Sequence, residues 1–111
     1  QGMVHPARLT DAVLLKAIVA MFERKSPDTF AHQIHALLNR PDAAPALAGV
    51  QVPTLVVCGR EDSWTPVSQH EEMAALVPGQ AVLHVVESCG HMSPMERPVS
   101  VAQALIAWLQ S

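Results

Sequence analysis

Several residue types are scarce in this chain of 111 residues. It has no tyrosine, two tryptophans and two phenylalanines, and only 15% of its residues are charged. The net charge is −3, and neither a cluster of Lys and Arg nor basic residues interleaved with aromatic ones occurs. Such a surface is poorly suited to phosphate groups, so we do not expect nucleic acid as a partner.

Long apolar runs are also absent. No run approaches the roughly 18 residues of a membrane-spanning helix, and the chain does not open with a charged segment followed by a hydrophobic one. We therefore expect a soluble, cytoplasmic protein with no membrane partner. The opening Gln-Gly-Met is typical of the remnant of a cleaved tag, which would make residues 1–2 foreign and Met3 the initiator.

Cysteine is nearly absent as well. Cys58 and Cys89 are too few for a disulfide framework. Both would lie at the ends of adjacent predicted strands and so near each other. We expect free thiols that are buried for structural reasons.

What the chain has in abundance is apolar surface, since half of its residues are hydrophobic. This is enough to require a core, and the length fits one domain or a part of one. Two helices are predicted first, one starting at Thr10 and Asp11 and one capped by Ser26 and stopped by Pro41. Their apolar stripes are Val13, Leu14, Ala17, Ile18, Met21 and Phe22, then Phe30, Ile34, Leu37 and Leu38.

The second half of the sequence alternates strands and helices. A continuous aliphatic run predicts a strand over Thr54–Cys58, and residues 81–87 predict another. Thr65 and Pro66 start a helix between them, with Val67, His70, Met73, Ala74 and Val77 as its buried stripe. Ser93, Pro94 and Glu96 have the spacing of a capping box before a terminal helix marked by Val101, Ala102, Leu105, Ile106 and Leu109. A strand, a helix and a strand in this order predict two parallel strands.

Two chemically active residues follow the two strands. Asp62 and His91 would both lie at the carboxyl ends of neighbouring parallel strands, where functional groups gather in open α/β sheets. A carboxylate that accepts from one imidazole nitrogen leaves the other nitrogen free to take a proton. Taken alone, an aspartate at such a position more often makes a turn or caps a helix, and a single loop histidine is more often incidental. The tandem pattern of strand-Gly-x-x-Asp and strand-Cys-Gly-His is more specific than either residue.

These two segments resemble a known family. VPTLVVCGREDSWTP is similar to the acid-bearing segment of the α/β-hydrolase fold, and VVESCGHMSPMERPVSVAQALIAWL to its histidine-bearing segment. The resemblance is to the branch of esterases, carbon-carbon hydrolases and dehalogenases. It implies that Asp62 is the catalytic acid, that His91 is the catalytic histidine, and that the neighbouring Glu61 is the weaker candidate for the acid.

The resemblance also implies a fold class and a division of the chain. We expect an α/β structure that is an incomplete α/β-hydrolase fold, strand-helix-strand-helix with two parallel strands, preceded by two helices from the junction of cap and core. Residues 1–46 would be the helical segment, a cap remnant and the helix after it. Residues 47–111 would be the C-terminal part of the hydrolase domain.

The nucleophile of that family is missing from these residues. The family orders its triad as nucleophile, acid and histidine, with the nucleophile in G-x-S-x-G, and no such motif occurs here. The His-Gly loop that helps to bind the oxyanion is absent too. Cys89 and Ser93 are each two residues from His91, but adjacent loop residues rarely aim at each other's reactive atoms.

Other histidines and the methionines have ordinary interpretations. His32 and His35 are three residues apart on a predicted helix but lack a third ligand, so we predict neither a metal nor a cofactor. His70 and His84 are expected to pack within a helix and a strand. Met73, Met92 and Met95 are interpreted as core fillers or pocket lining.

Three hypotheses for function remain. The chain is the C-terminal portion of an α/β-hydrolase, truncated and inactive alone, or one half of a split hydrolase whose partner chain supplies the serine. Otherwise it is a non-catalytic binding or oligomerisation module. Because the strands would have an unpaired edge and uncovered apolar faces, we expect a homo-oligomer formed through the exposed strand edge or by helix exchange, or association with a missing N-terminal half.

Overall fold

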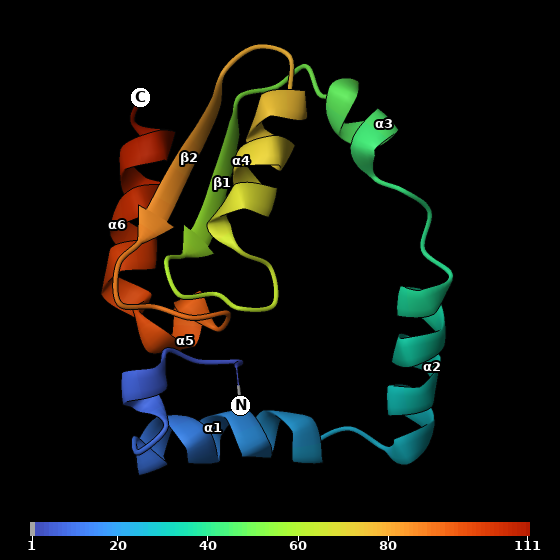
Figure 1. Cartoon of the computed structure of the whole chain (residues 1–111), viewed down its shortest axis with the longest axis vertical. Helices are drawn as coiled ribbons and strands as arrows, with labels where there is room; N and C mark the ends of the chain where they lie inside the picture. The colour runs from blue at the N-terminus through green and yellow to red at the C-terminus, as the bar shows by residue number, and fades with distance from the viewer. Residues whose placement is uncertain (1) are drawn as a thin grey trace.

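Two parallel strands form the centre of the structure. The computed structural model describes residues 2–111, in which β1 (Thr54–Gly59) pairs with β2 (Ala81–Val86) in one two-stranded sheet. The register runs from Thr54 opposite Ala81 to Gly59 opposite Val86. Both arrowheads in Figure 1 therefore end at the same edge, next to the N-terminal segment and α5. This confirms the predicted parallel pair.

Two helices cover the strands. The connection between β1 and β2 contains α4 (Val67–Leu76), and the chain ends in α6 (Pro98–Leu109). Each of these helices contacts both strands, and they lie on the two sides of the sheet in Figure 1. The predicted α/β class, with strand-helix-strand-helix after two N-terminal helices, is confirmed.

The first two helices begin where their capping residues predict. The side chain of Asp11 accepts from the Leu14 amide at the start of α1 (Ala12–Glu23). Ser26 accepts from the Thr29 amide at the start of α2 (Pro27–Leu38). Each cap satisfies an amide that has no partner within its helix. Two short helices complete the N-terminal half, η1 (Pro6–Arg8) and α3 (Ala44–Ala48).

The predicted capping box at the C-terminal helix was wrong. Residues 93–109 form two helices, α5 (Ser93–Glu96) and α6, separated at Arg97 with φ −136° and ψ 59°. Ser93 makes no capping hydrogen bond, because it lies inside α5 rather than before it. The break has a local cause: Pro98 disfavours a helical conformation at the residue before it, and then serves as the first residue of α6.

A small apolar core lies beyond the carboxyl ends of the two strands. Val4, Leu14 and Ile18 are buried together, with Met3, Leu15, Met92 and Met95 packed against them. Two of the methionines expected to be fillers, Met92 and Met95, do contribute to this cluster. The core thus joins the N-terminal segment and α1 to the loop that follows β2.

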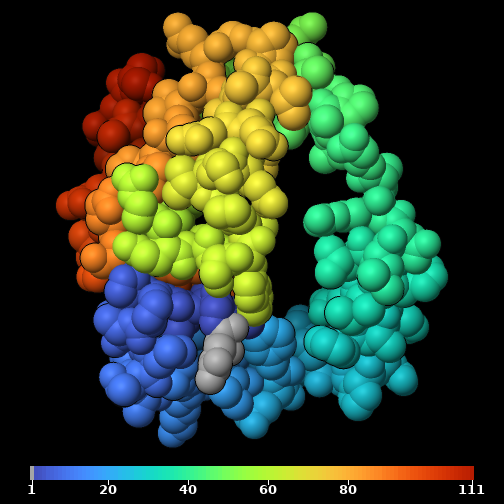
Figure 2. Space-filling view, viewed as in Figure 1, coloured from blue at the N-terminus to red at the C-terminus, as the bar shows by residue number. Residues whose placement is uncertain are grey.

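Several predicted apolar stripes are buried only in part or not at all. In α1, Leu14 and Ile18 are buried, but Val13 is 82% exposed. The α4 stripe is partly buried against the strands and ends at the buried Val77, whereas no residue of α2 is buried and His84 is exposed. Figure 2 shows an opening between α2 and α4, so α2 stands away from the sheet. The exposed stripe of α2 comprises Phe30, Ile34, Leu37 and Leu38. Periodicity marked the face of α2 correctly as apolar, but burial also requires a facing element, and residues 2–111 provide none for this helix.

Candidate functional site

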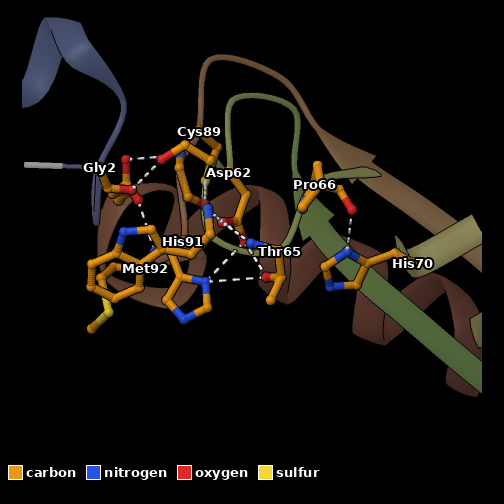
Figure 3. Close-up of polar contacts among 12 residues, drawn as sticks. Gly2, Asp62, Thr65, Pro66, His70, Cys89, His91 and Met92 are labelled. Atoms are coloured by element: carbon orange, nitrogen blue, oxygen red, sulfur yellow. Dashed lines mark hydrogen bonds and ion pairs between the residues drawn. The ribbon is translucent and has the colours of Figure 1, made fainter. Parts of the chain in front are cut away.

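The carboxyl ends of the two strands bring Asp62 and His91 together. Asp62 lies three residues after β1 and His91 five residues after β2. Because the strands are parallel and end in register, the two loops leave the same edge. Nδ1 of His91 lies 2.9 Å from Oδ2 of Asp62 (Figure 3).

The Asp62 carboxylate is buried and fully hydrogen-bonded. Its side chain is 4% exposed, and Oδ1 accepts from the amides of Trp64 and Thr65, both at 3.0 Å. The Thr65 hydroxyl donates to Oδ2 at 2.8 Å. Burial alone would raise the pKa of Asp62, but hydrogen bonds from the Thr65 amide, the His91 imidazole and the Thr65 hydroxyl outweigh it and hold the pKa below its ordinary value. Asp62 is therefore ionised at neutral pH.

An ionised Asp62 decides which nitrogen of His91 carries the proton. A carboxylate can only accept, so Nδ1 of His91 is the donor in the 2.9 Å contact. In neutral imidazole this leaves Nε2 as the nitrogen with the free lone pair. The His91 side chain is 36% exposed. The pair is thus arranged as a proton acceptor oriented by a carboxylate.

An aromatic ring lies next to the imidazole. The ring centroids of Trp64 and His91 are 5.1 Å apart, with an interplanar angle of 50°. Trp64 is itself 50% exposed. It follows Asp62 by two residues, so the loop that orients His91 also supplies one wall beside it.

The loop that carries His91 is held by the start of the chain. The amides of His91 and Met92 both donate to the carbonyl oxygen of Met3, at 3.0 and 3.2 Å. The hydroxyl of Ser63 donates to the carbonyl oxygen of Gly2 at 3.1 Å, so both loops contact this segment. Sequence reasoning missed this support because nothing near Met3 signals a contact almost ninety residues away.

Glu61, the alternative acid, does not face His91. Its Oε2 accepts from the Cys89 amide at 2.8 Å, and its Oε1 lies 3.8 Å from Nε2 of His5. The carboxylate that reaches the His91 imidazole is that of Asp62. The two neighbouring acids thus have different partners in the loop after β2. Glu61 binds its backbone at Cys89, and Asp62 binds the side chain of His91.

The nearby cysteine is unsuited to nucleophilic attack. Cys89 is fully buried, and its Sγ lies 3.6 Å from the carbonyl oxygen of Gly90. Burial, and then the negative charge of Glu96, raises the pKa of the thiol to about 11. Cys58 is also buried, and both thiols are free. These thiols belong to the interior.

Neither a metal cluster nor a membrane span is found in the described part of the chain. Across residues 2–111, no three His, Cys, Asp or Glu side chains gather as metal ligands. His32 and His35 are exposed on α2. No helix within the same residues is long and apolar enough to cross a membrane.

Comparison with known proteins adds independent information. The model of the alpha/beta hydrolase family matches residues 3–104. The chain is 30% identical over 103 residues to the 2-hydroxy-6-oxononadienedioate/2-hydroxy-6-oxononatrienedioate hydrolase of Klebsiella pneumoniae subsp. pneumoniae. That match covers 91% of this chain but only 35% of the relative. The 111 residues therefore span about a third of the length of this relative.

Solved structures are similar over comparable stretches. The structure of Est816, described as an N-acyl homoserine lactone degrading enzyme, matches 96% of this chain with 30% identity and a TM-score of 0.75, over 43% of its own length. A thermophilic esterase from Thermogutta terrifontis matches 65% of this chain with 39% identity and a TM-score of 0.62, over 26% of its own length.

Proposed function

This chain belongs to the alpha/beta hydrolase family, of which it is a partial fold, and we propose that it supplies the acid and the general base of a Ser-His-Asp triad. Asp62 would be the acid and His91 the base. The serine would come from polypeptide outside these 111 residues. The observation that carries the proposal is the 2.9 Å contact between the buried Asp62 carboxylate and Nδ1 of His91.

The proposed chemistry follows from the proton positions. Nε2 of His91 takes the proton of the serine hydroxyl as that oxygen attacks a carbonyl carbon. The ionised Asp62 stabilises the resulting imidazolium. His91 then gives the proton to the leaving group, and in the second half of the reaction it activates the water that releases the product.

The substrate class is proposed from the relatives. The similar proteins include a 2-hydroxy-6-oxononadienedioate/2-hydroxy-6-oxononatrienedioate hydrolase, an N-acyl homoserine lactone degrading enzyme and an esterase. All of these names are compatible with a substrate in which the bond that breaks lies next to a carbonyl carbon. Such a carbon is also what the serine of a triad attacks. We propose hydrolysis of an ester or of a carbon-carbon bond beside a carbonyl group.

The 111 residues alone are proposed to be inactive. They contain neither G-x-S-x-G nor a His-Gly oxyanion loop, and they span about a third of the Klebsiella pneumoniae relative. We also propose the division at residue 46, with residues 1–46 derived from the cap and residues 47–111 from the main domain. The exposed α2 fits a cap segment that lacks the rest of its domain.

Reconstitution of activity tests the proposal. The remaining portion of the Klebsiella pneumoniae relative is co-expressed with this chain, and hydrolysis of a nitrophenyl ester and labelling by a fluorophosphonate are measured. We expect no labelling of the chain alone and ester hydrolysis by the pair. His91→Ala should abolish the hydrolysis, whereas His84→Ala, on the exposed face of β2, should not. Labelling of the isolated chain would refute the proposal.

Exposed apolar surface favours a second candidate, a module whose role is association. β1 and β2 form a sheet of only two strands, so the outer edge of each lacks a strand partner within residues 2–111. The exposed large apolar side chains include Leu105, Ile106 and Leu109 of α6. We propose that the missing hydrolase portion covers these strand edges and apolar side chains. The alternative is that a second copy of the chain covers them, in a homo-oligomer formed by strand pairing or helix exchange. Light scattering distinguishes them, since only self-association gives a stable oligomer of the chain alone.

A further inference from the structure

Glu96 is a buried carboxylate that the proposed proton relay does not use. Asp62 and Glu96 are the buried charged side chains among residues 2–111, and Glu96 is only 2% exposed. Removing a carboxylate from water is costly unless donors replace the lost hydration. A charge placed this deep therefore needs a structural or functional reason.

Three backbone amides satisfy the Glu96 carboxylate. Oε1 accepts from the amides of His5 and Gly90, at 2.7 and 3.0 Å, and Oε2 accepts from the amide of Met92 at 3.0 Å. Two of these donors, Gly90 and Met92, are the residues immediately before and after His91. The third belongs to the N-terminal segment.

The same carboxylate also fixes the other support of His91. The His91 amide donates to the carbonyl oxygen of Met3, two residues before His5. Glu96 accepts from the His5 amide and so helps to fix the position of the N-terminal segment. In that position the Met3 carbonyl oxygen accepts from the His91 amide. Glu96 thus contacts both neighbours of His91 directly and also binds the segment that accepts from the His91 amide.

Asp62, by contrast, is held by its own loop. Its carboxylate is oriented by Trp64 and Thr65, which follow β1 and do not contact Glu96. The distance between Asp62 and His91 thus depends on how each loop is supported as well as on the Glu61–Cys89 hydrogen bonds that join the two loops. A displacement of about 1 Å in such a pair can cost on the order of a hundredfold in rate.

We propose that Glu96 is a positioning residue for His91, whose carboxylate clamps the peptide groups on both sides of the histidine and keeps its imidazole against Asp62. The positional effect holds whether or not the chain takes part in catalysis. Its consequence for the rate rests on the function proposed above.

Proton NMR of the 111-residue chain tests the clamp without any activity. An Nδ1 proton donated to a buried carboxylate gives a downfield resonance that exchanges slowly with water. Glu96→Gln keeps the size of the side chain but replaces one acceptor oxygen by an amide donor, which opposes a backbone donor. We expect exchange of the His91 Nδ1 proton to become roughly fivefold faster or more in Glu96→Gln, and the resonance to vanish in Glu96→Ala.

Glu61→Gln is the matched control. Glu61 is also a carboxylate that accepts from an amide of the His91 loop, but its donor is Cys89 rather than a neighbour of His91. The Nδ1 proton should exchange at the unaltered rate in this variant. An unchanged exchange rate in folded Glu96→Gln, or an equal acceleration in Glu61→Gln, would overturn the proposal. If Glu96→Ala does not fold, Glu96→Gln alone decides.

The reconstituted hydrolase separates this inference from the proposed function. There, Glu96→Gln should lower kcat about 10- to 100-fold with KM changed less than about twofold, because the base and not the substrate site is misplaced. No activity in the unaltered pair would refute the proposed function while leaving the NMR result intact. A normal kcat together with faster exchange of the Nδ1 proton in Glu96→Gln would show that the clamp has no role in catalysis.

Discussion

Gly59 and Gly90 cross so closely that a side chain on Gly59 would overlap the carbonyl oxygen of Gly90. A Cβ on Gly90 would in turn lie 2.6 Å from the backbone nitrogen of His5. The end of β1, the loop that carries His91 and the N-terminal segment are therefore stacked backbone on backbone. Only glycine permits this stacking, because the atoms in the way are main-chain atoms that cannot rotate aside.

Alanine at either crossing glycine should destabilise the fold. We expect Gly59→Ala and Gly90→Ala to lower the free energy of unfolding by about 1–3 kcal/mol, since main chain must move to admit the methyl group. Gly49→Ala is the control, because its nearest neighbour is a carbonyl oxygen at 3.5 Å and its φ is −92°. Urea denaturation measures all three, and an equal cost at Gly49 would contradict this explanation.

The Asp62 carboxylate should make the stability of the chain depend on pH. Its pKa is lower in the folded chain than in the unfolded chain, so it contributes stability above its ordinary pKa of about 4. That contribution is lost as the pH falls through the folded pKa. Asp62→Asn should therefore cost more stability at pH about 6 than at pH about 3. Urea denaturation at both values measures this, and a cost independent of pH would contradict it.

The Thr65 hydroxyl should help to keep Asp62 ionised. It donates to Oδ2 of Asp62 at 2.8 Å, and Thr65→Val removes this donor while keeping the shape of the side chain. We expect the pKa of Asp62 to rise toward its ordinary value, because one of the bonds that favours the charged form is lost. Carbon NMR of the carboxyl group measures this pKa, with Thr54→Val, whose hydroxyl contacts Val52, as control.

Both thiols should resist modification in the folded chain. Burial raises the pKa of Cys58 as well as that of Cys89, and for Cys58 the nearby Asp62 charge adds to the effect. Ellman's reagent at pH about 8 should react slowly with the native chain and with two thiols after unfolding. Rapid reaction of either native thiol would contradict the burial described here.

Local sequence signals were sufficient for most element boundaries. Asp11 and Ser26 begin helices because a side-chain oxygen next to free amides is favourable in any surroundings. The meeting of Asp62 and His91 was also predictable, since parallel strands must end at one edge. The same reasoning was misleading at Ser93, where the following Pro98 breaks the helix and the cap is not used.

Burial was not predictable in the same way. The stripe of α2 has the spacing of a buried face, yet Phe30 is 52% exposed because no described element faces it. Whether an apolar face is covered depends on the position of other elements, which periodicity does not contain.

The residue types, their capping signals and their placement after two parallel strands were enough to predict an α/β chain with an aspartate beside a histidine. The tertiary structure alone revealed the clamp around that pair. The carbonyl oxygen of Met3 accepts from the His91 and Met92 amides, and the Glu96 carboxylate accepts from the amides of His5, Gly90 and Met92. All of these donors are main-chain amides, which nearly every residue has, so which of them are paired depends on how distant segments pack and cannot be read from the sequence.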